Sequence, residues 1–297
     1  MKVTPLHPLF AAELTGADLS RAPDQALVDL VEDAMAEYAV LVVRGQAHIS
    51  DEDHVRFSRA FGPLELPHGT RTSGVVAPKR IGAELYDASN LGLDGEIMAS
   101  NPRFAAMSKG NELFHIDGSF HALPTKWSLL LGHEVAGEGG QTEFVDTRAV
   151  YDALPEETKQ RIEGQVAEHN VWISRKRIGF DSNLSLKDLY PAVHNAVVQT
   201  SASGRKCLCI GSHADYILGM DEDEGRALLE SLVEFASQPR FIYSHDWVKG
   251  DLLIWDNRCT LHRARPYDYT SVRRDLRRAT ISEYGPEISA IEAAAAA

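Results

Sequence analysis

Apolar residues recur with a helical period in several parts of this chain of 297 residues. Residues 24–38 and 221–236 carry one every three or four positions, and each stretch opens with an aspartate. Residues 50–61 begin with a serine followed by three acidic residues, which is typical of a capped helix start. Each stretch therefore predicts an amphipathic helix, and Pro155 with the two glutamates after it predicts another.

Short apolar runs between turn residues fill much of the remaining sequence. They occupy residues 39–43, 127–135, 141–146, 206–210, 252–255 and 276–281. The glycine-rich stretch 137–140 separates two of these runs and predicts that they form a hairpin. Many short strands with a few peripheral helices predict a mainly β protein, a double-stranded β-helix or jelly roll.

The chain shows no internal repeat and no linker that would divide it. Residues 1–292 are therefore expected to form a single domain. Residues 64–111 lack a clear period, and two interpretations stay open: an active-site lid or a plain surface excursion. The alanine tail at 293–297 is given no function.

The net charge limits which molecules the protein is expected to bind. A formal net charge of −13 argues against nucleic acid and anionic membranes, so a small anionic ligand would need locally concentrated basic residues. No secretory h-region or membrane-spanning run is evident, which predicts a cytoplasmic protein; homo-oligomerisation stays open. Cys207 and Cys209 would share one face of a strand, either as small buried residues or as a soft-metal pair.

A His-x-Asp pair provides the first candidate chemistry. His115 and Asp117 would lie on the same face of an extended segment, where both side chains could bind one metal ion. His262, after the strand at 252–255, is the candidate third ligand. Two imidazoles and one carboxylate leave metal positions open, as non-haem Fe(II) oxygenases require. A hydrogen-bonded polar pair is the alternative, and the spacing also occurs at His213 and Asp215.

Four arginines lie within the six residues 273–278. On an extended strand, Arg274 and Arg278 share one face with an apolar residue, while Arg273 and Arg277 share the other with Asp275. The second face alternates in charge and would suit solvent. The first face would point inward, and buried arginines require anions, so this pattern predicts two carboxylates near the strand.

These residues together resemble the Fe(II)/α-ketoglutarate-dependent dioxygenases of the taurine dioxygenase family. The resemblance runs nearly end to end and is more specific in the C-terminal half. It is carried by the stretches 6–12, 43–46, 115–117, 149–155, 204–206, 255–258 with His262, and 273–280.

The resemblance implies a role for each of seven residues. His115, Asp117 and His262 would hold Fe(II), while α-ketoglutarate and O2 would take the open metal positions. Arg274 and Thr142 would bind the distal carboxylate of α-ketoglutarate. Arg278, with His213, would bind the carboxylate of the primary substrate. That substrate would be an aryloxyacetate, whose hydroxylated ether carbon releases a phenol and glyoxylate.

The sequence departs from the family pattern before His115, where Thr70 and Glu96 stand in place of expected lysines. The sequence therefore does not identify the residues that bind the aromatic ring of the substrate. Three alternatives remain: the same chemistry on a sulfonate such as taurine or another small carboxylate, a zinc hydrolase, and a non-catalytic jelly-roll binding module. The hydrolase would leave the Arg274 and Thr142 site without a role.

Overall fold

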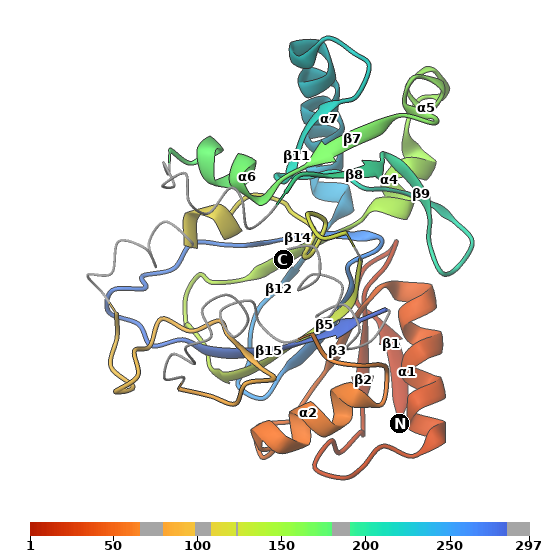
Figure 1. Cartoon of the computed structure of the whole chain (residues 1–297). Helices are drawn as coiled ribbons and strands as arrows, with labels where there is room; N and C mark the ends of the chain where they lie inside the picture. The colour runs from red at the N-terminus through yellow and green to blue at the C-terminus, as the bar shows by residue number, and fades with distance from the viewer. Residues whose placement is uncertain (66–79, 99–107, 123, 180–190, 284–297) are drawn as a thin grey trace, which may run out of the picture.

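The computed structural model describes residues 1–65, 80–98, 108–122, 124–179 and 191–283 (Figure 1). Two facing layers of strands carry helices on their outer sides, which is the predicted jelly roll. In these ranges, no helix has both the length and the apolar character needed to cross a bilayer.

The larger sheet has seven strands. Their spatial order is β1 (Lys2–Pro5), β2 (Ala12–Thr15), β3 (Val40–Val43), β13 (Leu252–Asp256), β5 (Thr125–Glu134), β15 (Asp275–Ser282) and β4 (Tyr86–Asp87). The β13 strand lies between β3 and β5, antiparallel to both. Its run of apolar residues is explained by burial on both faces.

The facing layer itself is the sheet of β12 (Ile242–His245), β6 (Thr142–Asp146) and β14 (Thr260–Ala264). Two further sheets lie on its outer side with α7 (Figure 1): β11 (Ala214–Ile217), β7 (Val166–His169) and β8 (Val193–Ala196); and β10 (Lys206–Leu208) with β9 (Val198–Thr200). The predicted hairpin is wrong, because β5 and β6 belong to different sheets. The glycine-rich stretch instead carries the chain from one layer to the other.

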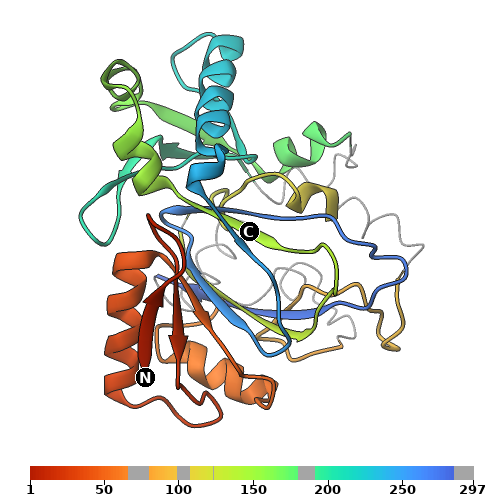
Figure 2. The same cartoon turned by 180° about the vertical axis from the view of Figure 1, so that it is seen from behind.

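The helices cover the outer faces. They are α1 (Gln25–Tyr38), α2 (Asp51–Arg59), α4 (Thr147–Ala153), α5 (Glu156–Ile162), α6 (Val171–Arg177), α7 (Glu222–Ala236) and the short 3₁₀ turn η3 (Pro239–Phe241). Figure 2 shows α1 and α2 at one end of the molecule and α7 at the other. The caps predicted at Ser50 and Asp221 are confirmed, whereas the sequence patterns did not predict α4 or α6.

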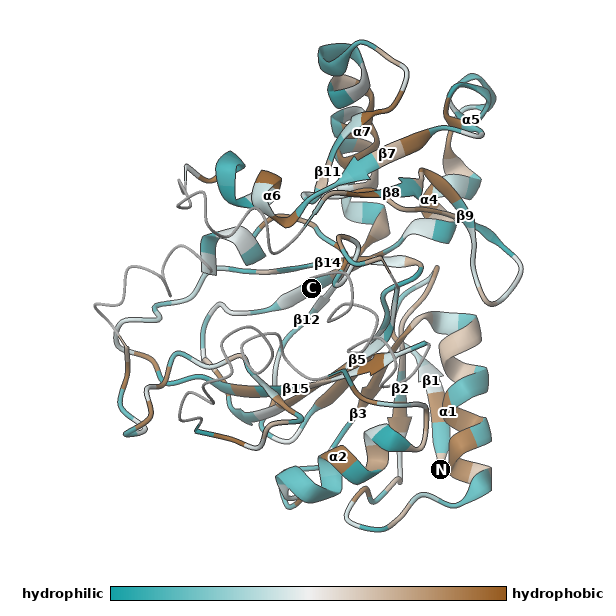
Figure 3. Cartoon of the chain, in the orientation of Figure 1, coloured by the Kyte–Doolittle hydropathy of each residue, from teal (hydrophilic) through white to brown (hydrophobic). Residues whose placement is uncertain are grey.

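Alternate side chains of the central strands enter two different cores. On β13, Leu252 and Ile254 pack with the helices α1 and α2, while Leu253 and Trp255 pack between the two layers. Figure 3 shows the hydrophobic stretches of the large sheet and the apolar stripe of α1. This alternation decides which residues of each central strand face the interior of the jelly roll.

The two faces of β15 follow the same rule. Leu276 lies in the core between the layers, and Arg278 lines the cavity there. The other face was predicted to suit solvent, and this is wrong for two of its three residues. Asp275 is buried, and Arg277 bonds to Asp51 of α2, because that helix covers this face. Only Arg273 is exposed, beside Glu134.

Candidate active site

Two of the three predicted metal ligands are brought together by backbone pairing. The amide N–H of His115 donates to the carbonyl of His262, and the reverse bond also forms, each at 3.0 Å. Such a pair places side chains on the same side of neighbouring strands. The two imidazole centroids consequently lie 4.2 Å apart.

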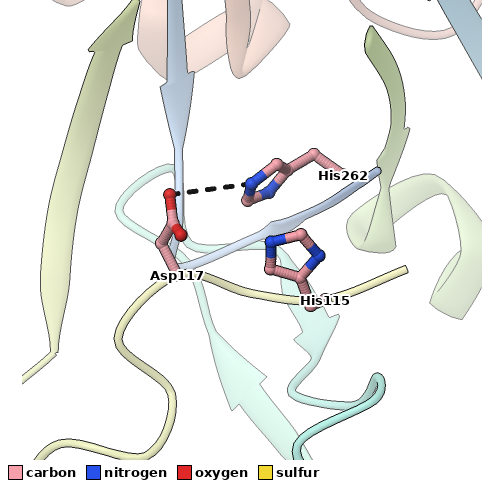
Figure 4. A group of neighbouring side chains, drawn as sticks. All are labelled: His115, Asp117 and His262. Atoms are coloured by element: carbon pink, nitrogen blue, oxygen red, sulfur yellow. Dashed lines mark ion pairs between the residues drawn. The ribbon is translucent and has the colours of Figure 1, made fainter. Parts of the chain in front are cut away.

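The third predicted ligand joins them from the same segment as His115 (Figure 4). Oδ2 of Asp117 lies 3.6 Å from Nε2 of His262. One potential ligand atom from each of the three residues lies within 4.8 Å of the others. Among the described residues, this is the one group of three or more His, Cys, Asp or Glu side chains with that property.

A hydrogen-bonded chain fixes the carboxylate. The indole N–H of Trp255 donates to Oδ1 of Asn257 at 2.9 Å, and the Asn257 amide donates to Oγ of Ser128 at 3.0 Å. Ser128 then donates to Oδ2 of Asp117 at 3.0 Å. Ser128 is not among the residues predicted from the sequence; its one signal there is that it is a small polar residue inside an apolar strand. Outer-shell bonds of this kind orient a ligating side chain.

The protonation states suit a divalent metal. Burial lowers the pKa of His115, and it lowers that of His262 to about 3, so both imidazoles are neutral near pH 7. Burial alone would raise the pKa of Asp117, but Arg278 and the two imidazoles hold it well below its usual range. Nδ1 of His115 donates to the carbonyl of Leu113 at 2.8 Å, which leaves Nε2 as the ligand atom. The residues therefore fit an Fe(II) ion.

The predicted cosubstrate residues reach the same cavity. Its volume is about 290 Å³, and Thr142 and Arg274 line it together with the three candidate ligands. The indole N–H of Trp247 donates to Oγ1 of Thr142 at 3.0 Å, so the hydroxyl hydrogen of Thr142 is left for another acceptor. Burial lowers the pKa of Arg274 to about 10, and no carboxylate among the described residues pairs with it.

The predicted substrate residues lie nearby. Nη1 of Arg278 donates to Oδ2 of Asp117 at 2.6 Å, while its buried Nε has no hydrogen-bond partner in the described part of the chain. His213 also lines the cavity, and its Nδ1 lies 3.2 Å from the carbonyl of Ile116. The same Nδ1 lies 3.3 Å from Oγ of Ser119, which can donate or accept. If Nδ1 donates to the Ile116 carbonyl, Nε2 of neutral His213 is an acceptor.

The rival His-x-Asp pair is divided by the fold. His213 faces the cavity, whereas Asp215 pairs with Arg226 of α7 at 3.2 Å. Cys207 and Cys209 are free and buried, so their interpretation as small buried residues is confirmed. Two cavity residues, Tyr86 and Arg175, carried no recognisable sequence signal.

A family comparison decides what kind of protein carries this site. The model described as "Taurine catabolism dioxygenase TauD, TfdA family" matches residues 2–280. The chain belongs to this family. It is accordingly an Fe(II)- and α-ketoglutarate-dependent dioxygenase that acts on a small molecule. The zinc-hydrolase and binding-module alternatives are thereby rejected.

Individual relatives of this dioxygenase cover nearly its whole length. It is 44% identical to the alpha-ketoglutarate-dependent 2,4-dichlorophenoxyacetate dioxygenase of Cupriavidus pinatubonensis (strain JMP 134 / LMG 1197), over 93% of this chain and 96% of the relative. It is 36% identical to the (S)-phenoxypropionate/alpha-ketoglutarate-dioxygenase of Sphingobium herbicidovorans, over 91% of each chain. The crystal structure of AAD-2 in complex with Mn(II) and N-oxalylglycine matches with a TM-score of 0.86 at 40% identity, covering 96% of this chain and 99% of that one.

Proposed function

We propose that this dioxygenase hydroxylates the ether carbon of an aryloxyacetate such as 2,4-dichlorophenoxyacetate. The observation that carries the proposal is a pair of arginines that line the cavity, Arg274 directly before β15 and Arg278 within it. Arg274 has no carboxylate partner among the described residues, and Arg278 retains an unpaired buried Nε. Two anions satisfy them, one from α-ketoglutarate and one from the substrate. The names of the relatives at 44% and 36% identity support an aryloxyalkanoate substrate.

In this proposal, His115, Asp117 and His262 hold the metal. Fe(II), α-ketoglutarate and O2 supply the oxidising power that replaces C–H by C–OH, while α-ketoglutarate leaves as succinate and CO2. The chain keeps both imidazoles neutral by burial and fixes the carboxylate through Ser128. These residues hold the ligand atoms in place before the substrate enters.

The cosubstrate carboxylate binds between Thr142 and Arg274. The indole of Trp247 occupies the acceptor side of the Thr142 hydroxyl, so its hydrogen points to the incoming carboxylate oxygen. The Arg274 guanidinium supplies a charge-assisted contact to the same group. Tyr267, whose ring lies 5.4 Å from that guanidinium, helps keep water away from it.

The substrate carboxylate binds the free donors of Arg278. His213 lines the same cavity and contributes a second donor when its ring carries a hydrogen on Nε2. Anchoring one end of an aryloxyacetate in this way places the ether carbon, one bond from the carboxylate, beside the metal site. The hydroxylated product is a hemiacetal, which collapses to a phenol and glyoxylate.

The surroundings agree with a small anionic ligand. The protein carries a net charge of −13, yet its cavity holds three arginines. This contrast supports local recognition of small anions, without nucleic-acid or membrane partners. We also propose that the enzyme is cytoplasmic. Residues 80–98 provide part of the cavity wall through Tyr86 and Ala88, in line with a lid function for 64–111. The rest of that segment, at 66–79 and 99–107, lies outside the described residues.

The test is a turnover panel with the iron-loaded enzyme. Phenol and succinate release should rise together with 2,4-dichlorophenoxyacetate, should require α-ketoglutarate, and should be absent with taurine. Succinate release with taurine and none with phenoxyacetates would transfer the assignment to the sulfonate alternative. Succinate formed without any product from the phenoxyacetate would contradict the proposed hydroxylation.

A further inference from the structure

A third arginine reaches the cavity from the side opposite β15. Arg175 belongs to α6, and Figures 1 and 2 show α6 and β15 on opposite sides of β14. Its guanidinium packs against Gly110, where a methyl group would collide with Nη1 of Arg175. The glycine therefore provides the space in which the guanidinium lies.

Arg175 differs from the other cationic side chains of α6. Burial lowers its pKa, and across the described ranges no hydrogen bond or ion pair engages its guanidinium. By contrast, Arg177 donates to the carbonyls of Ser212 and Ala214, and Lys176 is exposed. A partly buried guanidinium has five N–H donors, and leaving them without acceptors costs free energy. An occupant of the cavity would supply the missing acceptor.

Tyr86 indicates where that acceptor lies relative to Arg278. The Tyr86 ring is 5.0 Å from the Arg278 guanidinium, and the Tyr86 phenol also acts on the pKa of Arg175. Arg278, Tyr86 and Arg175 thus line the same cavity, and both arginines interact with Tyr86. A substrate whose carboxylate binds Arg278 would extend past Tyr86 and present its far end to Arg175.

The charges of the cavity define the chemistry of that far end. Two carboxylates, Glu65 and Asp117, face three guanidiniums, which leaves one positive charge among the described lining arginines and acids. Fe(II) and the α-ketoglutarate dianion together add no net charge. A single oxyacetate carboxylate therefore neutralises the site, and Arg175 needs an acceptor atom without a further full charge.

We propose that Arg175 is a specificity-determining residue that donates hydrogen bonds to an uncharged acceptor on the substrate ring, at the end remote from the oxyacetate. The preferred substrates are then aryloxyacetates with a para carbonyl or nitro group. This inference rests on the proposed function, which it extends from a substrate class to a substitution pattern.

The test compares 4-acetylphenoxyacetate with unsubstituted phenoxyacetate in the wild type and in Arg175→Met. The wild type should favour the acetyl compound in kcat/KM by about tenfold or more, as a hydrogen bond to a charged donor would give. In Arg175→Met this ratio should approach one, with the KM for α-ketoglutarate unchanged. Anaerobic dissociation constants of the two compounds should show the same loss of preference.

Two further variants separate recognition from folding. Gly110→Ala keeps the arginine but displaces its guanidinium, so it should also lose the preference for the acetyl compound. Lys176→Met removes a charge from the same helix outside the cavity and should keep the preference. An unchanged ratio in Arg175→Met, or an equal loss for both substrates, would overturn the inference while leaving the proposed function intact. Absence of phenol release from every phenoxyacetate in the wild type would overturn both.

Discussion

The two faces of β15 place arginines in opposite electrostatic situations. On the face covered by α2, Arg277 bonds to both carboxylate oxygens of Asp51 at 2.8 and 2.7 Å and to Asp275 at 2.8 Å. Asp275 is also held by Arg80 at 2.7 Å. Every charge on this face therefore has an opposite charge within the protein itself.

The arginines that face the cavity have few acidic side chains of the protein as partners. Arg274 makes one long bond to the carbonyl of Gly140, at 3.3 Å, and has no carboxylate partner among the described residues. Arg278 shares Asp117 with the proposed metal site. Exposure does not separate the two faces, since the side chains of Arg278 and Arg277 are 22% and 20% exposed. The two faces differ in the partner of the guanidinium: a carboxylate of the protein on one face, and a carboxylate of a ligand, as proposed, on the other.

The largest effect is expected for Arg278→Met. Turnover of 2,4-dichlorophenoxyacetate should fall on the order of a hundredfold or more, because the substrate carboxylate loses its charged partner. The KM for α-ketoglutarate should change little. Since Arg278 also bonds to Asp117, iron content must be measured in parallel. Loss of iron that accounts for the whole decrease would mean that Arg278 supports the metal and does not bind substrate.

Arg274→Met should act on the cosubstrate. The KM for α-ketoglutarate is expected to rise by roughly 10- to 100-fold, as loss of a hydrogen bond to a charged group implies. Thermal stability should not fall, because the arginine has no acidic partner among the described residues. Steady-state kinetics and a melting curve on the same preparation check both statements. An unchanged KM would place the cosubstrate carboxylate elsewhere.

Arg277→Met should give the reverse result. Removing it leaves Asp275 with Arg80 as its remaining ionic partner and deprives Asp51 of two bonds, so unfolding free energy should fall by roughly 1–3 kcal/mol. Turnover per folded molecule should stay at the wild-type value. Arg273→Met is the matched control, because its pair with Glu134 is exposed and contributes little. Equal destabilisation by both variants would contradict the distinction drawn between these two pairs.

The difference between the two faces was predicted from the sequence only in part. The period of two correctly assigned Arg274 and Arg278 to the cavity, because that period follows from strand geometry alone. The buried state of Asp275 was not predictable, since it depends on α2 packing over β15 from more than 200 positions away. The false hairpin between β5 and β6 has the same origin, because local turn signals do not specify which layer receives the next strand.

The candidate site shows the same limit. His115, Asp117 and His262 were identified from residue type, spacing and family resemblance, and the fold brings them together. Ser128 and Arg175 were missed, because their importance comes from neighbours distant in sequence. Nothing around a serine in an apolar strand or an arginine in a short basic helix specifies a partner in advance. Only the fold places Ser128 beside Asp117, and Arg175 beside Gly110.

The smallest expected effect concerns the helix that covers the charge-paired face. His54 of α2 is fully buried, and burial, with His133 and Arg277 adding to it, lowers its pKa to about 3. An unfolded histidine titrates near pH 6.5, so below that pH the unfolded chain binds a proton that the folded chain excludes. His54 should therefore make stability fall by up to about 1.4 kcal/mol per pH unit as the pH drops below 6.5. Denaturant unfolding between pH 7.5 and 5.5 should show a shallower acid dependence in His54→Gln than in the wild type. Parallel curves for the two proteins would show that this histidine takes up no additional proton on unfolding.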